Sequence, residues 1–212
     1  MTRIEDRVDD VLLYDLGGSE HPSFFFLDAA GEVLGRHDPS DTSVKALEET
    51  GSRVKRSLEL QKKADAGDAG ARIDLRIAQC DLLVIEFSDL EGEIEGVTLT
   101  AEQERAVATL RADATVSDMM QVLRKNRDDA AKSLVAEEFL ALYKRGTHPG
   151  RPGNRRFYWV VVAEQAVAKK DAPMLKDAIS GLRALAGAEP AGREAQQLLE
   201  LELRLKELEA AK

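Results

Sequence analysis

The sequence predicts a mainly α-helical protein with a small α+β part at its N-terminus. Of the 212 residues, 43% are hydrophobic and 33% are charged, which is enough to bury one sizeable core or two small ones. Aromatic residues make up only 5%, and leucine and alanine recur within stretches rich in glutamate, lysine and arginine, as is typical of helices. One short segment near the N-terminus departs from this pattern and predicts paired strands.

The strand pattern covers residues 21–36. His21-Pro22-Ser23 leads into the apolar residues 24–27, the turn Ala29-Ala30-Gly31 follows, and residues 32–36 resume a strand-like pattern. A proline before an apolar strand, a short turn with glycine and a second strand together indicate a β-hairpin. Residues 38–43 supply turn and N-cap residues, which predict that a helix follows. We expect that helix to bury a stripe formed by Val44, Leu47, Val54 and Leu58.

This hairpin resembles the C-terminal half of the thioredoxin fold, over about residues 10–62. In that family a cis-proline precedes the strand and lines a peptide-binding face, while an upstream Cys-x-x-Cys carries the electrons. The resemblance implies that His21, Pro22 and Ser23 bind peptide. The alternative is a proline that merely begins an edge strand. Cys80 is the single cysteine, so the redox motif itself is absent.

The domain organisation expected is a partial thioredoxin-like unit at residues 1–63, a linker at 64–70 and a helical domain at 71–212. Small and polar residues predict the linker. Beyond it, Ile73, Ile77, Cys80, Val84 and Phe87 recur at helical spacing and predict one central helix. Thr100 and Gln103 match a capping box, so a helix or helix pair should begin there and continue to about Lys125.

The remaining residues predict stacked α-hairpins. The helix after Asp128 should end at Gly146 and bury Leu134, Phe139, Leu142 and Tyr143. Residues 157–162 have strand propensity, but residues 163–170 continue them without a break, so we expect a helix. Asp171 is a good N-cap for the next helix, and Pro190 precedes the last one.

The spacing of Ala178, Leu182, Leu185 and Pro190 resembles the closing part of a tetratricopeptide repeat. That resemblance implies an architecture of stacked helical hairpins that bind other proteins. The last helix has an apolar stripe, made by Leu198, Leu201, Leu205 and Leu208. We expect the stripe to cap the stack; a coiled-coil dimer seam is the alternative, although such seams need three or four heptads.

Motifs for catalysis and metal binding are missing from the sequence. No Gly-x-Ser-x-Gly elbow and no phosphate-binding glycine loop occurs. His21, His37 and His148 lack the spacing of metal ligands. Cys80 lies among apolar residues and is expected to be an inert core residue, and the acidic residues 89–95 are expected to form a solvated helix end. The sequence therefore predicts no catalytic residue, no metal and no cofactor.

One basic segment stands out in a chain whose net charge is -9. Residues 144–156 contain five lysines and arginines and no acidic residue. Arg151, Arg155 and Arg156 could therefore bind an anion or an acidic partner. The alternative is a solvated loop next to core aromatics. The acidic net charge argues against general nucleic-acid binding, which depends on lysine and arginine.

The leading functional hypothesis is a non-catalytic protein that interacts with a protein partner. The alternative is the C-terminal fragment of a thioredoxin-like thiol-disulfide oxidoreductase whose redox motif lies upstream. An unpaired hairpin edge would also predict a homo-oligomer. No apolar run approaches the ~20 residues of a membrane span, and the charged N-terminus lacks a signal-like segment. We therefore expect a cytoplasmic protein as written, or an exported one if the N-terminus is truncated.

Overall fold

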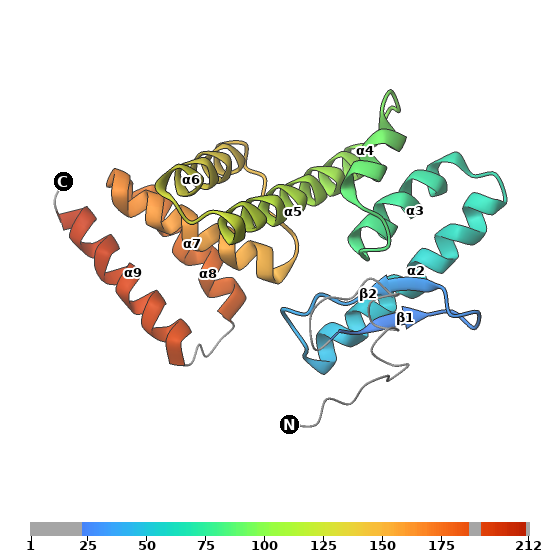
Figure 1. Cartoon of the computed structure of the whole chain (residues 1–212), viewed down its shortest axis with the longest axis horizontal. Coiled ribbons are helices and arrows are strands. Elements are labelled where there is room, and N and C mark those ends of the chain that lie inside the picture. The colour runs from blue at the N-terminus through green and yellow to red at the C-terminus, as the bar shows by residue number, and fades with distance from the viewer. Residues whose placement is uncertain (1–22, 187–191, 211–212) are drawn as a thin grey trace. The chain divides into compact units, whose positions relative to one another are not determined.

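The computed structural model describes residues 23–186 and 192–210, which form a mainly helical protein as predicted (Figure 1). These residues contain eight helices and one antiparallel sheet of two strands. The chain divides into two compact units, residues 1–104 and 105–212, with the boundary inside α5 (Ala101–Lys125). Each unit has its own packing and is described separately.

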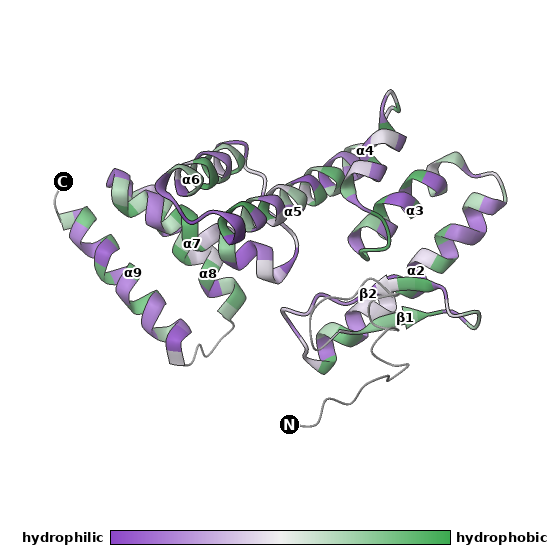
Figure 2. Ribbon diagram, in the orientation of Figure 1, coloured by the Kyte–Doolittle hydropathy of each residue, from purple (hydrophilic) through white to green (hydrophobic). Residues whose placement is uncertain are grey.

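The predicted hairpin is confirmed in the first unit. β1 (Phe25–Leu27) pairs antiparallel with β2 (Val33–Arg36), with Phe26 opposite Gly35. Gly31 lies in the turn at φ 90°, a backbone conformation that favours glycine. Figure 2 shows hydrophobic residues along β1 and much of β2. The sheet therefore carries apolar side chains that a neighbouring element has to cover.

Helix α2 (Val44–Asp65) covers one face of this sheet. Ser43 is its N-cap and accepts a hydrogen bond from the backbone N–H of Ala46 at 3.2 Å. The predicted apolar stripe is correct only in part, because Val54 is buried whereas Val44 is 71% exposed and Leu58 is 39% exposed. The close approach of β2 to the helix occurs at Gly35, where a Cβ atom would lie 2.8 Å from the side chain of Val54. The buried residues of α2 are Thr50, Val54, Ser57 and Ala64.

Two helices form where one central helix was expected, which corrects that prediction. α3 (Ala69–Asp81) ends at Leu82, and α4 (Phe87–Ile94) begins after a short turn. Leu83 adopts φ 60° in this turn, and the carbonyl of Leu82 accepts a hydrogen bond from the backbone N–H of Arg36 at 2.8 Å. The side chain of Leu82 is completely buried. Packing against β2 therefore ends a helix that its leucine-rich sequence would have continued.

Residues 64–70, predicted as a linker, form the end of α2, a tight turn and the start of α3 inside the first unit. Asp68 is the N-cap of α3 and accepts a hydrogen bond from Ala71 at 3.0 Å. Ala64 and Ala71 are buried, because small side chains let these two helices pack closely. The division of the chain into units falls between Glu104 and Arg105 instead.

The second unit is built from consecutive helices, as predicted. After α5 come α6 (Asp129–Lys144), α7 (Pro152–Lys169), α8 (Ala172–Ala186) and α9 (Gly192–Ala210). From α6 onward each helix packs against the next. The predicted capping box is confirmed at the start of α5, where Thr100 and Gln103 exchange side-chain to backbone hydrogen bonds of 3.0 and 3.2 Å.

The core of the second unit lies around α7 and α8. Tyr158, Phe139 and Leu175 are completely buried there. Gly181 on α8 lies directly against Trp159 on α7, where a Cβ atom would come within 2.3 Å of the indole ring. Two residues expected in this core differ from the prediction, since Leu134 is 44% exposed and Tyr143 is only half-buried. Close packing of α7 on α8 therefore depends on glycine at position 181.

The apolar stripe on α9 packs against this core. Leu198 is buried, and Leu201, Leu205 and Leu208 are partly buried, which agrees with the expectation of a helix that caps the stack. Pro190 lies outside the described residues. Leu199 and Leu203 lie on the outer side of the same helix and are exposed.

Candidate functional site

The first candidate site is the outer edge of β1. The backbone N–H of His37 donates to the carbonyl of Phe24 at 3.0 Å, so the hydrogen-bonding groups of Phe24 face β2. Because these groups alternate along a strand, those of Phe25 point to the opposite edge. Within the described residues the sheet has only two strands. The edge at Phe25 is therefore open as far as the described part of the chain extends.

The outer edge of β2 differs, because the loop after α3 occupies it. The hydrogen bond from Arg36 to the Leu82 carbonyl lies on this side of the strand. Among residues 23–186 and 192–210, only the outer edge of β1 is thus left without a neighbouring segment.

The two faces of the hairpin also differ. Phe26 faces α2, where its ring would lie 3.3 Å from a Cβ atom at Gly51. Phe25 and Leu27 point to the opposite face, because neighbouring side chains along a strand alternate. Leu27 is 44% exposed, and the guanidinium of Arg36 lies over the Phe25 ring at 5.9 Å. Apolar groups and one arginine therefore border the open edge.

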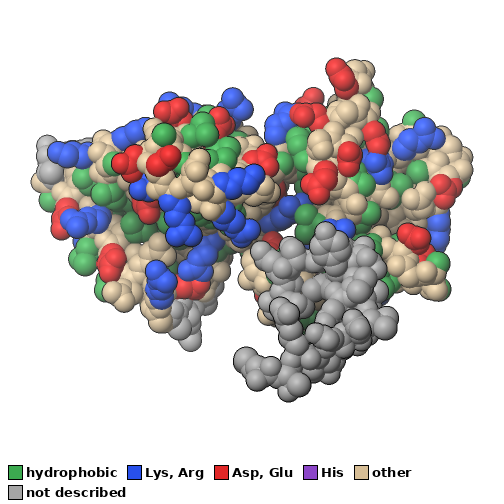
Figure 3. Space-filling model, in the orientation of Figure 1, with side chains coloured by type: hydrophobic (Ala, Val, Ile, Leu, Met, Phe, Trp, Pro, Cys, Tyr) green, Lys and Arg blue, Asp and Glu red, His purple; other side chains and the backbone are tan. Residues whose placement is uncertain are grey.

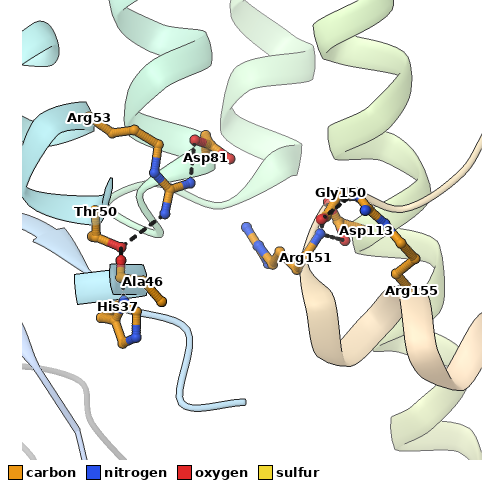
Figure 4. Close-up of polar contacts among 9 residues, drawn as sticks. All are labelled: His37, Ala46, Thr50, Arg53, Asp81, Asp113, Gly150, Arg151 and Arg155. Atoms are coloured by element: carbon orange, nitrogen blue, oxygen red, sulfur yellow. Dashed lines mark hydrogen bonds and ion pairs between the residues drawn. The ribbon is translucent and has the colours of Figure 1, made fainter. Parts of the chain in front are cut away.

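A polar network fixes the end of the hairpin to α2 (Figure 4). His37 is buried, with Nδ1 2.8 Å from the hydroxyl of Thr50 and Nε2 bonded to the carbonyl of Asp41. Arg53 donates to Thr50 at 3.1 Å and to Asp81 on α3 at 2.8 Å. The residues are therefore satisfied by each other, and we assign the network a structural role that holds β1 and β2 in place.

The predicted peptide-binding residues lie at the start of β1. His21 and Pro22 are outside the described residues, and Ser23 is half-buried immediately before Phe24. The conformation of Pro22 thus stays a prediction.

The basic segment of the second unit is organised around one buried carboxylate. Asp113 on α5 is 2% exposed and accepts hydrogen bonds from the backbone N–H groups of Gly150 and Arg151 at 2.9 and 3.1 Å. Asn154 donates to the same carboxylate at 3.0 Å. A carboxylate at the start of α7 satisfies free amides and interacts favourably with the helix dipole. Figure 4 shows Asp113 beneath this loop, with the Arg151 side chain directed away from it.

The predicted anion-binding arginines therefore have separate environments. Arg155 donates to the carbonyl groups of Pro149 and Gly150 at 3.1 and 2.9 Å, so it helps to fold the loop. Arg156 forms an ion pair with Glu194 on α9 and remains 45% exposed. The structure does not bring Arg151, Arg155 and Arg156 together around one ligand position.

Arg156 instead lies at a polar cleft between α7 and α9. The cleft has a volume of about 490 Å³. The described residues that line it are Arg156, Arg193, Gln196, Gln197 and Glu200. Sequence reasoning missed Arg193, which lies 37 positions beyond Arg156 and has no local motif around it. Figure 3 shows several Lys and Arg side chains gathered on the visible face of the second unit.

The aromatic residues beside the basic segment belong to the core. His148 lies 4.9 Å from Trp159 and 5.7 Å from Tyr158 between ring centroids, and its Nδ1 is 3.3 Å from the Tyr158 hydroxyl. Burial lowers the pKa of His148, and the nearby guanidinium of Arg155 lowers it further. Burial raises the pKa of Tyr158. These aromatics therefore anchor the loop rather than form a ligand-binding platform.

The remaining candidates from the sequence are Cys80 and the acidic residues 89–95. Cys80 is 3% exposed, as expected for a core thiol, and Glu93 in the acidic stretch pairs with Arg76. Within residues 23–186 and 192–210, no group of three or more His, Cys, Asp or Glu side chains could hold a metal ion. None of the described helices is both long and apolar enough to cross a membrane.

Comparison with known proteins adds no assignment. No protein-family model matches the chain, and the searches of curated proteins and of solved structures give no match. The function has to be argued from the geometry of the two units.

Proposed function

We propose that this chain is a non-catalytic protein-interaction protein whose first unit binds an extended segment of a partner protein. The observation that carries this proposal is the outer edge of β1 at Phe25, which no described residue covers. An exposed sheet edge offers backbone donors and acceptors to another strand, a recognition mode that many peptide-binding domains use.

The side chains next to this edge define the chemistry of the partner segment. Phe25 and the exposed Leu27 offer an apolar surface, and Arg36 adds a positive charge above the Phe25 ring. A strand added to β1 would place every second side chain on this face. The partner segment should therefore alternate apolar residues with polar ones.

The hairpin and α2 also support the thioredoxin-like resemblance, in which this edge would adjoin the peptide-binding proline. The stacked helices of the second unit support a tetratricopeptide-like interaction role in the same way. Both resemblances remain proposals about the fold, and function depends on the site rather than on the fold.

A second candidate function rests on the same edge. In a complete thioredoxin-like sheet, the missing half would pair at this position, and the chain would be the C-terminal part of a thiol-disulfide oxidoreductase. The intact mass of the protein from its native source tests this. A mass well above 23.3 kDa, with a Cys-x-x-Cys in the added residues, supports the oxidoreductase, whereas a mass at that value contradicts it.

Photo-crosslinking in the native host tests the interaction role. The full chain would carry p-benzoylphenylalanine at Leu27, with a matched control at Leu134 on α6; both leucines are 44% exposed. We expect a crosslinked adduct of discrete mass at position 27 that does not form at position 134. No adduct at position 27, or the same adduct at both positions, would contradict binding at the edge.

The substitution Phe25→Pro provides a second test. Proline removes the backbone donor that points outward and leaves the hydrogen bonds between β1 and β2 in place. We expect the adduct to disappear while the circular dichroism spectrum stays unchanged. An adduct that persists in this folded variant would show that the backbone edge is not used.

A further inference from the structure

The polar cleft between α7 and α9 has the size of a ligand site. Its volume is about 490 Å³, within the range of about 300–1,000 Å³ that is typical of small-molecule sites. Most such sites are largely apolar, whereas the described lining of this one is two arginines, two glutamines and one glutamate. A lining of this kind favours a charged ligand over an apolar one.

One end of the cleft is positive. Arg156 is held at this end by its ion pair with Glu194. A guanidinium has five N–H donors, so donors remain for a second acceptor. Arg193 is exposed and forms no ion pair with any residue in the described part of the chain. Two guanidinium groups can therefore converge on one carboxylate or phosphate, with the planar geometry that arginine provides.

The other end of the cleft is negative. Glu200 lies seven positions after Arg193 on α9, so both residues share one helix face about 10 Å apart along the axis. Gln196 lies between them and donates to Glu200 at 3.1 Å, which orients the carboxylate. The cleft thus places positive charge and negative charge at a fixed separation.

We propose that this cleft binds a peptide segment that carries an acidic side chain and a basic side chain about 10 Å apart. The acidic side chain binds Arg156 and Arg193, and the basic side chain binds Glu200. An extended peptide rises about 3.4 Å per residue and its side chains alternate between two faces. The two side chains must share a face, so they belong to residues two positions apart, about 7 Å, and the long glutamate and lysine side chains span the remaining distance. This site lies in the second unit and is independent of the β1 edge.

Two-dimensional ¹⁵N NMR of the full chain, titrated with the peptide acetyl-Glu-Ala-Lys-amide, tests the proposal. We expect saturable chemical-shift changes in the amides of residues 193–200, with a dissociation constant on the order of 1 mM or below. Absence of these changes up to about 10 mM peptide, where a 1 mM site would be nearly saturated, would overturn the proposal.

Variants and a second probe separate the two charges. Arg193→Met should weaken binding about tenfold, equivalent to about 1.4 kcal/mol, and Glu200→Gln should also weaken it. Arg204→Met is the matched control, because Arg204 lies on the same helix and pairs with Glu207 outside the cleft. Equal weakening by Arg193→Met and Arg204→Met would refute a local site.

Inorganic phosphate tests whether negative charge alone is sufficient. We expect phosphate to bind more weakly than the peptide and with no dependence on Glu200. Phosphate that binds as tightly as the peptide would overturn the dipolar ligand, and peptide binding that Glu200→Gln leaves unchanged would do the same.

Discussion

Replacement of Gly181 by alanine tests the close packing of α7 on α8 quantitatively. The new Cβ would lie 2.3 Å from Cε2 and 2.4 Å from Nε1 of Trp159. The indole is rigid and 93% buried, with an exposed fraction of 7%, so it cannot move without shifting its neighbours. The added methyl group must therefore strain the core.

The expected magnitude is the difference between two effects. Overpacking of a core costs about 1–3 kcal/mol, while replacing glycine by alanine inside a helix gains about 1 kcal/mol. The 2.3 Å approach to a buried indole places the overpacking cost in the upper part of that range, about 2–3 kcal/mol, so we expect a net loss of about 1–2 kcal/mol in the free energy of unfolding. For a unit of this size, each kcal/mol lowers Tm by roughly 4–8 °C.

Fluorescence of Trp159, the only tryptophan in the chain, is the assay for urea and thermal unfolding. Gly92→Ala on α4 is the matched control, because nothing lies within 4 Å of a Cβ atom at that position. This change should stabilise the first unit, and unfolding followed by circular dichroism measures the effect. Trp159→Phe should reduce the cost of Gly181→Ala, so the two changes should be non-additive. Because Trp159→Phe removes the fluorophore, circular dichroism follows unfolding of all four proteins in this comparison. A Gly181→Ala protein as stable as the parent would refute the reasoning.

Three further predictions concern the second unit. Lys170→Gly should stabilise this unit by about 0.5–1 kcal/mol, because Lys170 ends α7 at φ 55°, where glycine is favoured. The control Lys169→Gly should instead destabilise the unit by about 1 kcal/mol. Equal effects of the two changes in urea unfolding would contradict this prediction. Asp113→Asn should lower the free energy of unfolding by about 1–3 kcal/mol, because the new amide would direct a donor at the N–H groups of Gly150 and Arg151. An unchanged midpoint of urea unfolding would contradict this. The pKa of His148 is lowered in the folded protein, so the imidazole is protonated more readily in the unfolded chain, and the free energy of unfolding should fall as pH drops below about 6.5. His148→Gln should flatten this part of the plot of stability against pH. An unaltered plot for this variant would contradict the prediction.

Local signals were sufficient for the elements that depend on neighbouring residues. The turn at Gly31 and the capping box at Thr100 and Gln103 form as predicted. The helical continuation after residue 162 correctly outweighed the strand propensity of residues 157–162, because residues of high helix propensity follow without a break.

Features that depend on tertiary contacts could not be predicted. The break between α3 and α4 is stabilised by Arg36, which lies 46 positions before Leu82, and no glycine or proline marks it. Val44 and Leu58 share the expected stripe but face solvent, because the sheet that α2 covers is too small to bury the whole helix.

The candidate sites show the same distinction. The open edge of β1 was expected from the hairpin pattern alone, since one hairpin cannot pair both of its edges. The roles of Arg155 and Arg156 required the structure, because their partners are backbone carbonyl groups in a folded loop and a glutamate 38 positions away. Two arginines that are adjacent in the sequence therefore have different partners in the structure.

Amide hydrogen exchange at Phe25 in the isolated full chain tests the open edge most directly. The account predicts that the Phe25 N–H exchanges at close to the rate of an unprotected amide. The N–H groups of Arg36 and His37, bonded to Leu82 and Phe24, should exchange much more slowly. If the Phe25 amide is as protected as that of His37, the edge is already occupied, and the proposed binding of a partner strand would be contradicted.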